Sequence, residues 1–416
     1  MLSSAPVTDP RRAIEAVFRI ESARLIAGLA RLTRDLGHAE ELAQEALLAA
    51  LEKWPAAGVP DNPGAWLMTT AKHRAIDELR RARLLERKHG ELGAPQPRTP
   101  QLEDRLDEDV GDDLLRLVLI ACHPVLPTEA LVALTLRLLG GLTTVEIARA
   151  FLVPEPTIAQ RIVRAKRTLA EAKVPFEVPR GAELLARLAP VLQVIYLVFN
   201  EGYAATAGAD WMRPALCEDA LRLGRILAGL APEAPELHGL VALMEIQASR
   251  AAARAGPSGE PILLLEQNRA RWDQLLIRRG LAALRRAEEL GGGRGPYALQ
   301  AAIAACHARA RTAGETDWPR IVALYTALRQ LDPSPVIELN RAVAVSMAFG
   351  PAAGLALVDA VAEALGGYHL LPSVRGDLLA KLGRLDEARL EFERAAALSR
   401  NSRERDLLLK RAAACG

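Results

Sequence analysis

The residues most suited to chemistry form a stripe of hydrogen-bond donors near the middle of the chain. The stripe comprises Thr157, Gln160, Arg161 and Arg164. Residues three and four apart share one face of an α-helix, so these donors can face a major groove together and contact base edges. Lys166 and Arg167 follow as positive charges suited to phosphates. The pattern predicts a DNA-reading helix, and the alternative is a solvated basic helix in an ordinary bundle.

The residues before the stripe predict the element that positions it. The segment 143–151 has the pattern of a short amphipathic helix, with the small residue Ala148 where a second helix must cross closely. A turn follows, in which Leu152 stands where helix-turn-helix units usually have glycine. The next helix has prolines in its first turn and points Ile158 and Ile162 inward. A helix-turn-helix is therefore predicted.

Two further surfaces are predicted in the first 90 residues. The segment 39–54 is typical of an amphipathic helix whose outer side is acidic and amide-bearing, and such a face suits a protein partner better than DNA. The segment 64–81 places Trp66 upstream of a strongly basic helix, a combination suited to stacking unpaired bases while gripping the backbone. Alone this second signal is weak, because a single tryptophan at helical spacing more often belongs to a core.

Composition favours an all-α protein of two or three domains. The chain has 416 residues, of which 50% are hydrophobic and only 4% aromatic, and its apolar residues are mostly alanine and leucine, both strong helix formers. The formal net charge of +2 means that any polyanion-binding role must come from local patches. No apolar stretch approaches the roughly 18 residues of a membrane span, and the start of the chain lacks a secretory-signal pattern. We therefore expect a cytoplasmic protein without a membrane partner.

Charge and proline content divide the chain. The segment 97–113 has seven acidic and two basic residues, a net charge of −5, which predicts a flexible linker. It separates two basic segments, Lys72–His89 and Arg161–Lys173, each with a net charge of +4. Prolines and a glycine between residues 174 and 181 predict a second boundary, after which the pattern is again helical.

The C-terminal region has signs of a helical repeat. Small and large residues alternate as in a tetratricopeptide unit, in which two antiparallel helices pack closely. They are Gly376, Gly383, Ala388, Phe392 and Ala395. The tryptophan usual early in such a unit is missing, as is the closing proline. We expect a helical-repeat array, with an irregular helical bundle as the alternative.

Other candidate sites have weaker support. A ligand pocket is conceivable at Asn200, Glu201, Tyr203, Asp210 and Trp211, although capping and bridging of helices is favoured. A second cluster is equally compatible with a concave protein-binding face and with the start of a surface helix; it comprises Gln267, Arg269, Arg271, Trp272 and Asp273. The histidines lack an i, i+4 pair and the cysteines are widely separated. No metal, cofactor or catalytic residue is therefore expected, and the chain is not predicted to be an enzyme.

Taken together, these motifs resemble the extracytoplasmic-function (group IV) sigma factors of bacterial RNA polymerase. The resemblance rests on the order of an acidic and amide-bearing helix, a helix with the pattern Trp-Leu-x-x-x-Ala-x-x-Arg-Ala-Ile-Asp, an acidic linker and a helix-turn-helix. It implies a sigma-two domain over residues 1–92, a linker over 93–111 and a sigma-four domain over 112–175. Residues 181–416 resemble the tetratricopeptide-like extension of one subgroup, in which the extension replaces or supplements the usual anti-sigma regulation.

The resemblance also implies roles for individual residues. Binding to the clamp helices of the largest polymerase subunit falls on Glu41, Leu42, Gln44 and Glu45. Melting and reading of the minus-ten promoter element falls on Trp66, Lys72, His73 and Arg74, with Arg80 and Arg81 on the DNA backbone. Reading of the minus-thirty-five element falls on Thr157, Gln160, Arg161 and Arg164, with Lys166 and Arg167 on phosphates. The implied partners are core RNA polymerase, including the flap of its second-largest subunit, promoter DNA, and an unknown regulatory partner of the C-terminal domain.

The residues leave more than one class of function open. One is a promoter-specificity subunit of RNA polymerase, and another is a one-component helix-turn-helix transcription regulator with a helical sensor domain. The N-terminal 90 residues favour the first, because a repressor needs neither a tryptophan-bearing melting helix nor an acidic clamp-binding face. A helical-repeat scaffold or enzyme is the third reading, and it predicts no salt-dependent DNA affinity.

Overall fold

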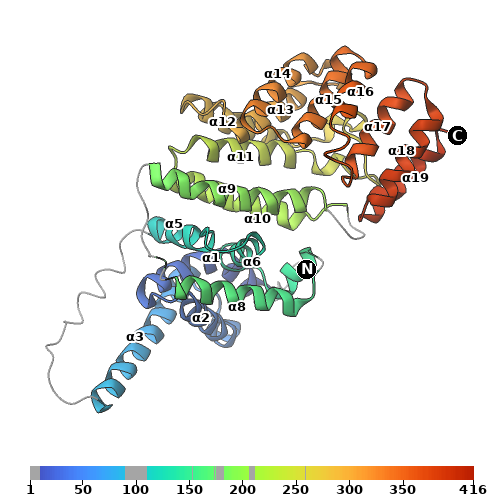
Figure 1. Ribbon diagram of the computed structural model, residues 1–416. Helices are drawn as coiled ribbons and strands as arrows, with labels where there is room; N and C mark the ends of the chain where they lie inside the picture. The colour runs from blue at the N-terminus through green and yellow to red at the C-terminus, as the bar shows by residue number, and fades with distance from the viewer. Residues whose placement is uncertain are drawn as a thin grey trace, which may run out of the picture. The chain divides into compact units, whose positions relative to one another are not determined.

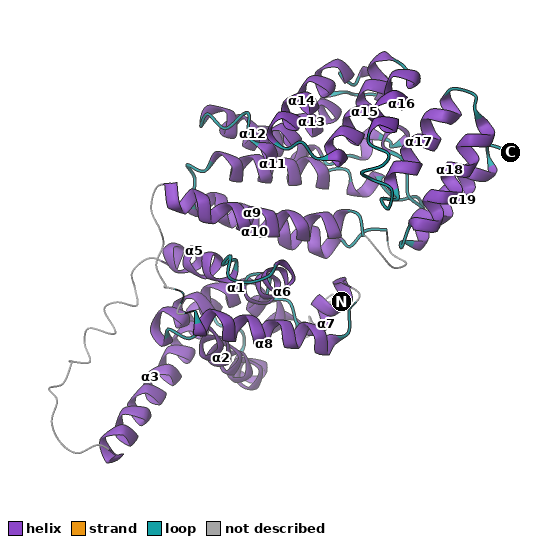
Figure 2. Cartoon of the chain, in the orientation of Figure 1, coloured by secondary structure: helices purple, strands orange, loops and turns teal. Residues whose placement is uncertain are grey.

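Helices make up the regular structure of the described chain (Figure 2). The computed structural model describes residues 10–89, 110–151, 153–172, 174, 182–205, 211–257 and 259–416. Within these ranges, an isolated antiparallel bridge joins Ala255 and Pro261, and Asn401 is a further bridge residue. The predicted all-α fold class is therefore confirmed. The chain divides into two compact units, Met1–Val194 and Ile195–Gly416, with the division inside one helix.

The first unit is built around its first helix. Its helices, labelled in Figure 1 except for α7, which is labelled in Figure 2, are α1 (Pro10–Thr33), α2 (Leu36–Ala57), α3 (Pro63–His89), α5 (Val110–Ala121), α6 (Thr128–Leu138), α7 (Thr144–Phe151), α8 (Glu155–Glu171) and the first part of α9 (Ala182–Tyr203). α1 packs against α2, α3, α5 and α6. Leu25 and Leu29 of α1 are almost completely buried, as is Leu67 of α3. The burial of these side chains supplies the hydrophobic stabilisation of this unit.

Short side chains let α2 lie close to its neighbours. Asp35 is the N-cap of α2, because its carboxylate accepts a hydrogen bond from the backbone N–H of His38 at 3.0 Å. The buried face of the helix that follows carries Ala39, Ala43 and Ala46, each 0% exposed. Small residues at these positions allow α1 and α3 to approach the α2 backbone closely. The other faces of α2 remain available for polar residues.

The second unit contains the end of α9 and a succession of shorter helices. They are α10 (Pro214–Leu230), α11 (Pro235–Ala248), η2 (Ala251–Ala253), η3 (Leu264–Glu266), η4 (Arg269–Arg271), α12 (Gln274–Glu289), α13 (Pro296–Arg309), η5 (Ala313–Glu315), α14 (Trp318–Leu331), α15 (Pro335–Phe349), α16 (Pro351–Ala360), α17 (Leu370–Lys381), α18 (Leu385–Leu398) and α19 (Ser402–Ala413). Proline occupies the first position of several of them, where its missing N–H costs no hydrogen bond. Two of these starts, Pro296 and Pro335, follow short breaks between neighbouring helices.

Consecutive helices of this unit pack against each other from α10 to α19. In the α17–α18 pair, Gly376 faces Phe392, and a Cβ built on Gly376 would lie 2.9 Å from the Cε1 of that ring. Ala388 and Phe392 are 0% and 1% exposed, so the predicted alternation of small and large residues does fill this interface. The helical C-terminal region is confirmed, while its assignment to the tetratricopeptide class stays a prediction.

The end of the acidic segment belongs to a helix. The predicted linker over 93–111 lies largely outside the described residues, and α5 already begins at Val110. Asp113 is 4% exposed and pairs with Arg31 at 3.3 Å and with Arg116 at 2.6 Å. The inclusion of Asp113 in a flexible linker was therefore wrong, because its charge is neutralised by two arginines of the folded unit. The predicted boundary at 174–181 also lies outside the described residues, apart from Val174.

In the described ranges, no helix is both long enough and apolar enough to cross a lipid bilayer.

We predict that Gly376→Ala lowers the free energy of unfolding by about 1–3 kcal/mol, because the new methyl group overpacks the contact with Phe392. Gly229→Ala is the control, since Gly229 lies in α10 with open space around its Cβ position. This control should be neutral or should stabilise by up to about 1 kcal/mol, the difference in helix propensity. Urea unfolding followed by circular dichroism measures both, and equal stability of the two variants would contradict the packing described.

Candidate nucleic-acid interface

The helix-turn-helix predicted from the sequence is present. Thr143 and Glu146 form a capping box at the start of α7: the N–H of Thr143 donates to Glu146 Oε2 at 2.7 Å, and the N–H of Glu146 donates to Thr143 Oγ1 at 3.2 Å. Ile147 of α7 and Ile158 and Ile162 of α8 are buried between the helices. Leu152 lies outside the described residues. The two helices therefore pack through their apolar faces as in a helix-turn-helix, and the opposite face of α8 points away from α7.

The outer face of α8 carries the predicted donor stripe. Gln160 and Arg164 are exposed, while Thr157 and Arg161 are half-buried. Within the described part of the chain, none of these four side chains forms a hydrogen bond or an ion pair. Arg167 adds a charge to this face: its side chain is 71% exposed and lies 3.6 Å from the carboxylate of Glu171. Such a row of unengaged donors is what base and phosphate contacts require.

Lys166 lies on the other side of α8 and does not share this face. It forms an ion pair with Glu40 of α2, and Arg137 of α6 donates from Nε to the same carboxylate at 2.6 Å. The assignment of Lys166 to phosphate binding is therefore corrected. The reason is helical geometry: nine residues at about 100° each place Lys166 opposite Thr157.

Glu40 is the centre of this interaction. It is 6% exposed, and burial raises the pKa of its carboxyl group, but the positive charges of Lys166 and Arg137 outweigh burial and hold that pKa below the ordinary value of 4.5. The carboxylate therefore remains charged at neutral pH and links α2, α6 and α8. Sequence reasoning missed Glu40, although its position one turn before Gln44 on an acidic helix is visible in the sequence.

Beside Glu40, a cavity of about 440 Å³ contains most of the residues proposed for protein binding. It is lined by Gly37, Glu40, Glu41, Gln44, Glu45, Arg137 and Lys166. Leu42 is not among them: it is 1% exposed and packs on the apolar face of α2 with Ala39 and Ala46. The assignment of Leu42 to an external binding surface is therefore corrected. Glu41, Gln44 and Glu45 contribute one face of α2 to this cavity, and Glu40, Arg137 and Lys166 add further polar groups.

One residue of the basic helix α3 forms an ion pair with this face of α2. Arg74 donates from Nη1 to Glu45 Oε2 at 2.7 Å, so two residues predicted to serve different partners are paired. Trp66 is half-buried and meets Trp54 edge to face, with ring centroids 5.2 Å apart and Lys53 Nζ 5.9 Å from the Trp66 ring.

Two other basic residues of α3 that were assigned to the minus-ten element differ in exposure. His73 is exposed and Lys72 is half-buried. Arg80 and Arg81 lie in α3, but their side chains are outside the described residues. The described side chains therefore leave His73 as the most accessible member of the predicted minus-ten set.

The candidate ligand pocket at 200–211 is explained by helix bridging. Glu201 is buried and forms an ion pair with Arg213, and the N–H of Arg213 donates to the carbonyl of Gly202 at 2.7 Å. These bonds connect the end of α9 to the start of α10, as favoured from the sequence. Asp210 lies outside the described residues.

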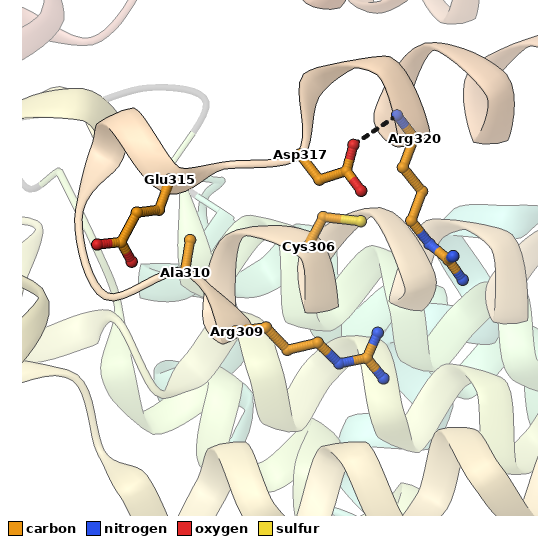
Figure 3. Close-up of a pocket in the computed structure, with 6 residues that line it drawn as sticks. All are labelled: Cys306, Arg309, Ala310, Glu315, Asp317 and Arg320. Atoms are coloured by element: carbon orange, nitrogen blue, oxygen red, sulfur yellow. Dashed lines mark hydrogen bonds between the residues drawn. The ribbon is translucent and has the colours of Figure 1, made fainter.

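A separate pocket of about 360 Å³ lies where α13 leads into α14. Figure 3 shows its lining residues: Cys306, Arg309, Ala310, Glu315, Asp317 and Arg320. Burial raises the pKa of the Cys306 thiol, so the thiol stays protonated and is a poor nucleophile. Asp317 caps α14 by accepting a hydrogen bond from the N–H of Arg320 at 3.0 Å. The pocket therefore offers charged groups engaged in local structure rather than an activated nucleophile.

Three regions of the chain match known protein families. Residues 18–84 match sigma-70 region 2, residues 116–169 match sigma-70 region 4, and residues 187–288 match a family of unknown function, DUF6596. The helix-turn-helix lies within the second match, and α2 and most of α3 lie within the first. These two regions define a sigma factor, a DNA-binding protein of transcription initiation.

Relatives narrow this class to one family. The chain is 31% identical to the ECF RNA polymerase sigma factor SigL of Mycobacterium tuberculosis over 33% of this chain and 76% of that protein. It is 30% identical to the ECF RNA polymerase sigma factor SigK of Mycobacterium ulcerans over 37% of this chain and 82% of that protein. The chain belongs to the ECF RNA polymerase sigma factor family.

The similarity to another relative extends much further along the chain. An uncharacterized protein of Rhizobium meliloti (strain 1021) is 45% identical over 91% of this chain and 90% of its own length. No solved structure matches. The region after α8, which is helical in this chain, is therefore included in the similarity to this relative.

We predict that Glu40→Gln lowers the free energy of unfolding of the first unit by about 2 kcal/mol, because Arg137 and Lys166 lose their shared counter-charge. Glu129→Gln, at an exposed position at the start of α6, is the control and should change stability by less than about 0.5 kcal/mol. Chemical denaturation measures both values.

The same carboxylate predicts a pH dependence. Because the folded-state pKa of Glu40 lies below its ordinary value of 4.5, its contribution is complete above that value and disappears as the pH falls through the folded-state pKa. Stability measured between about pH 7 and pH 3 should thus fall less steeply for Glu40→Gln than for the unmodified chain. Parallel curves for the two proteins would show that Glu40 is not responsible.

Proposed function

We propose that this chain directs core RNA polymerase to its promoters by using two separate surfaces of the first unit. The exposed stripe of α8 reads the minus-thirty-five element, and α3 contacts the minus-ten element. The face of Glu41, Gln44 and Glu45 on α2 binds the clamp helices of the largest polymerase subunit, and residues 112–175 also contact the flap of the second-largest subunit. These assignments go beyond the family membership, which gives polymerase and promoter DNA as partners without the residues.

One observation carries the DNA-reading assignment. The side chains of Thr157, Gln160, Arg161 and Arg164 form a row on a helix-turn-helix and have no partner among the described residues. Arginine and lysine that only solubilise a helix commonly pair with carboxylates three or four residues away, and Arg161 and Arg164 have none at ion-pair distance in the described part of the chain. Free guanidinium groups at this spacing fit bidentate recognition of guanine and of phosphates.

We also propose that the second unit controls the availability of the sigma factor and binds a regulatory partner. Two observations support this role: the unit has its own buried core around Leu339, Leu379 and Phe392, and the Rhizobium relative covers this region as well as the sigma-70 regions. An independently packed domain can present a partner surface without disturbing DNA recognition.

The first test separates DNA reading from polymerase binding. Arg161→Ala with Arg164→Ala should lower promoter-dependent transcription by at least about tenfold, since each specific contact to a base is worth about 1–3 kcal/mol, and should leave polymerase affinity unchanged. Arg24→Ala is the matched control, because Arg24 is an exposed arginine on α1 with a side chain 59% exposed. Transcription by purified core polymerase and binding of the full chain to that polymerase give the two readouts.

The second test changes the face of α2 and is expected to weaken polymerase binding itself. Gln44→Ala with Glu45→Ala should weaken the binding of the full chain to core polymerase by about tenfold, as expected for residues near the centre of an interface. Glu52→Ala, at an exposed position on the same helix but outside the cavity, should not change it. If the two double variants affected both readouts equally, the division of surfaces would be refuted. Tight promoter binding by the chain without polymerase would instead favour a one-component regulator.

A further inference from the structure

The second unit contains a cluster in which arginines alternate with aromatic rings. We define the arginine–aromatic cluster as Tyr203, Arg250, Arg254, Arg269 and Trp272. The Arg254 guanidinium carbon lies 3.5 Å from the centre of the Tyr203 ring, and that of Arg250 lies 5.9 Å from the same ring. Arg250 and Arg269 lie 5.4 and 5.2 Å from the centre of the Trp272 ring. Each ring therefore has two guanidinium groups beside it.

The positive charge of this cluster is opposed by Glu315 only at longer range, through an electrostatic effect that raises the pKa of Arg269. Arg250 donates to the neutral side chains of Gln247 and Gln267, and Arg254 donates to the carbonyl of Tyr203. Arg269 donates to the carbonyls of His307 and Ala310 and to the hydroxyl of Thr316. In the described ranges, no carboxylate forms an ion pair with any of the three arginines.

Two of these arginines are deeply buried. Arg254 is 6% exposed and Arg269 is 9% exposed. Buried charges in proteins are normally paired, because their removal from water is costly. The cost is reflected in the pKa of both side chains, which burial and the neighbouring Arg250 lower. Cation–π contacts offset part of this cost, but they leave the net charge in place.

Hydrogen-bond donors in the same place are also unused. The buried Nε–H of Arg269 and the Nε1–H of Trp272 have no acceptor, and His307 Nδ1 has no partner. Trp272 is 3% exposed and His307 is 8% exposed. Burial and the charges of Arg250 and Arg269 lower the pKa of His307 to about 4, so this histidine is neutral at neutral pH and does not add to the charge. A buried donor without a partner calls for a physical explanation, and a bound anion is one that also fits the neighbouring arginines.

We propose that the arginine–aromatic cluster is a binding site for a small anion with a carboxylate or phosphate group. Such an anion supplies the contact ion pair that the described carboxylates do not make with these arginines, and it accepts from the unused N–H groups of Arg269 and Trp272. Guanidinium groups bind both oxyanions through paired N–H donors, and an adjacent aromatic ring holds the planar guanidinium in position. Arg250 is half-buried and gives the anion contact with solvent.

This site was divided between two motifs in the sequence. Tyr203 belongs to the motif at 200–211, and Arg269 and Trp272 belong to the one at 267–273, while Arg250 and Arg254 were part of neither. The turn from α11 through η2 brings the two arginines to the rings of both motifs. All five residues of the cluster lie in the second unit, so anion binding there does not depend on how the first unit contacts polymerase and DNA.

Isothermal titration calorimetry of the full chain with inorganic phosphate, and separately with citrate, tests the proposal at constant ionic strength set by sodium chloride. Saturable binding of either is expected, and it should raise the thermal midpoint of the full chain by on the order of 5 °C at concentrations far above the Kd. Phosphate binding alone or citrate binding alone identifies which oxyanion chemistry the site prefers. Absence of saturable binding by both anions would overturn the proposal.

Variants locate the binding. Arg250→Gln should raise the Kd at least tenfold, and Trp272→Phe, which keeps a ring but removes the N–H donor, should also weaken binding. Arg271→Gln is the matched control, because Arg271 is an exposed arginine of η4, the short helix that also contains Arg269, and it lies outside the cluster. Circular dichroism confirms that each variant is folded. An unchanged Kd in both folded cluster variants, or an equal loss in Arg271→Gln, would show that the anion binds elsewhere.

Discussion

The first unit depends on one buried carboxylate. Glu40 of α2 is shared by Arg137 of α6 and Lys166 of α8, so three helices that lie far apart in the sequence meet at a single negative charge. A buried charge is tolerated when its partners are well placed, and removal of one partner leaves the others without compensation. Because Lys166 is held inward, the rotation of α8 about its axis is fixed and Gln160 and Arg164 face outward. The proposed DNA-reading face and the cavity beside α2 are thus set by the same interaction.

The second unit also contains a buried carboxylate that basic residues of two other helices approach. Glu245 of α11 is 2% exposed and is approached by Arg225 at 2.8 Å and Arg279 at 3.7 Å, which again places a buried carboxylate between basic residues of neighbouring helices. In the arginine–aromatic cluster, which begins a few residues further along the chain, the described carboxylates form no contact ion pair with the arginines, and Glu315 acts on Arg269 only at longer range.

Much of the architecture could be predicted from local chemistry. Prolines in the first turn of α8 and the alternation of small and large residues around Phe392 concern one helix or one pair of neighbouring helices, so both could be found from the sequence. Periodicity also placed the donor stripe on one face of α8. The errors came from treating a run of basic or acidic residues as one surface: Lys166 and Leu42 each lie on the opposite side of their helix from the neighbours with which they were grouped.

What could not be predicted are the pairings between distant segments. The partners of Glu40 lie 97 and 126 residues away, and nothing in an acidic helix indicates which basic residues will reach it. Likewise, the family resemblance assigned Arg74 and Glu45 to different macromolecular partners, although in the folded chain they form an ion pair with each other at 2.7 Å. Long-range electrostatic pairing depends on how helices pack, and the identity of single residues does not encode it.

The last helix is attached to a distant part of the second unit. Asn401, 1% exposed, caps α19 through its side-chain oxygen and donates from Nδ2 to the carbonyl of Ala205 at 3.1 Å, just beyond α9. In a simple stack of helix pairs each pair touches only its neighbours, so the terminal pair frays first. A bond that joins the final helix to residues near the beginning of the unit opposes that fraying. The unit is thereby expected to melt as a whole, like a closed ring of contacts rather than an open row.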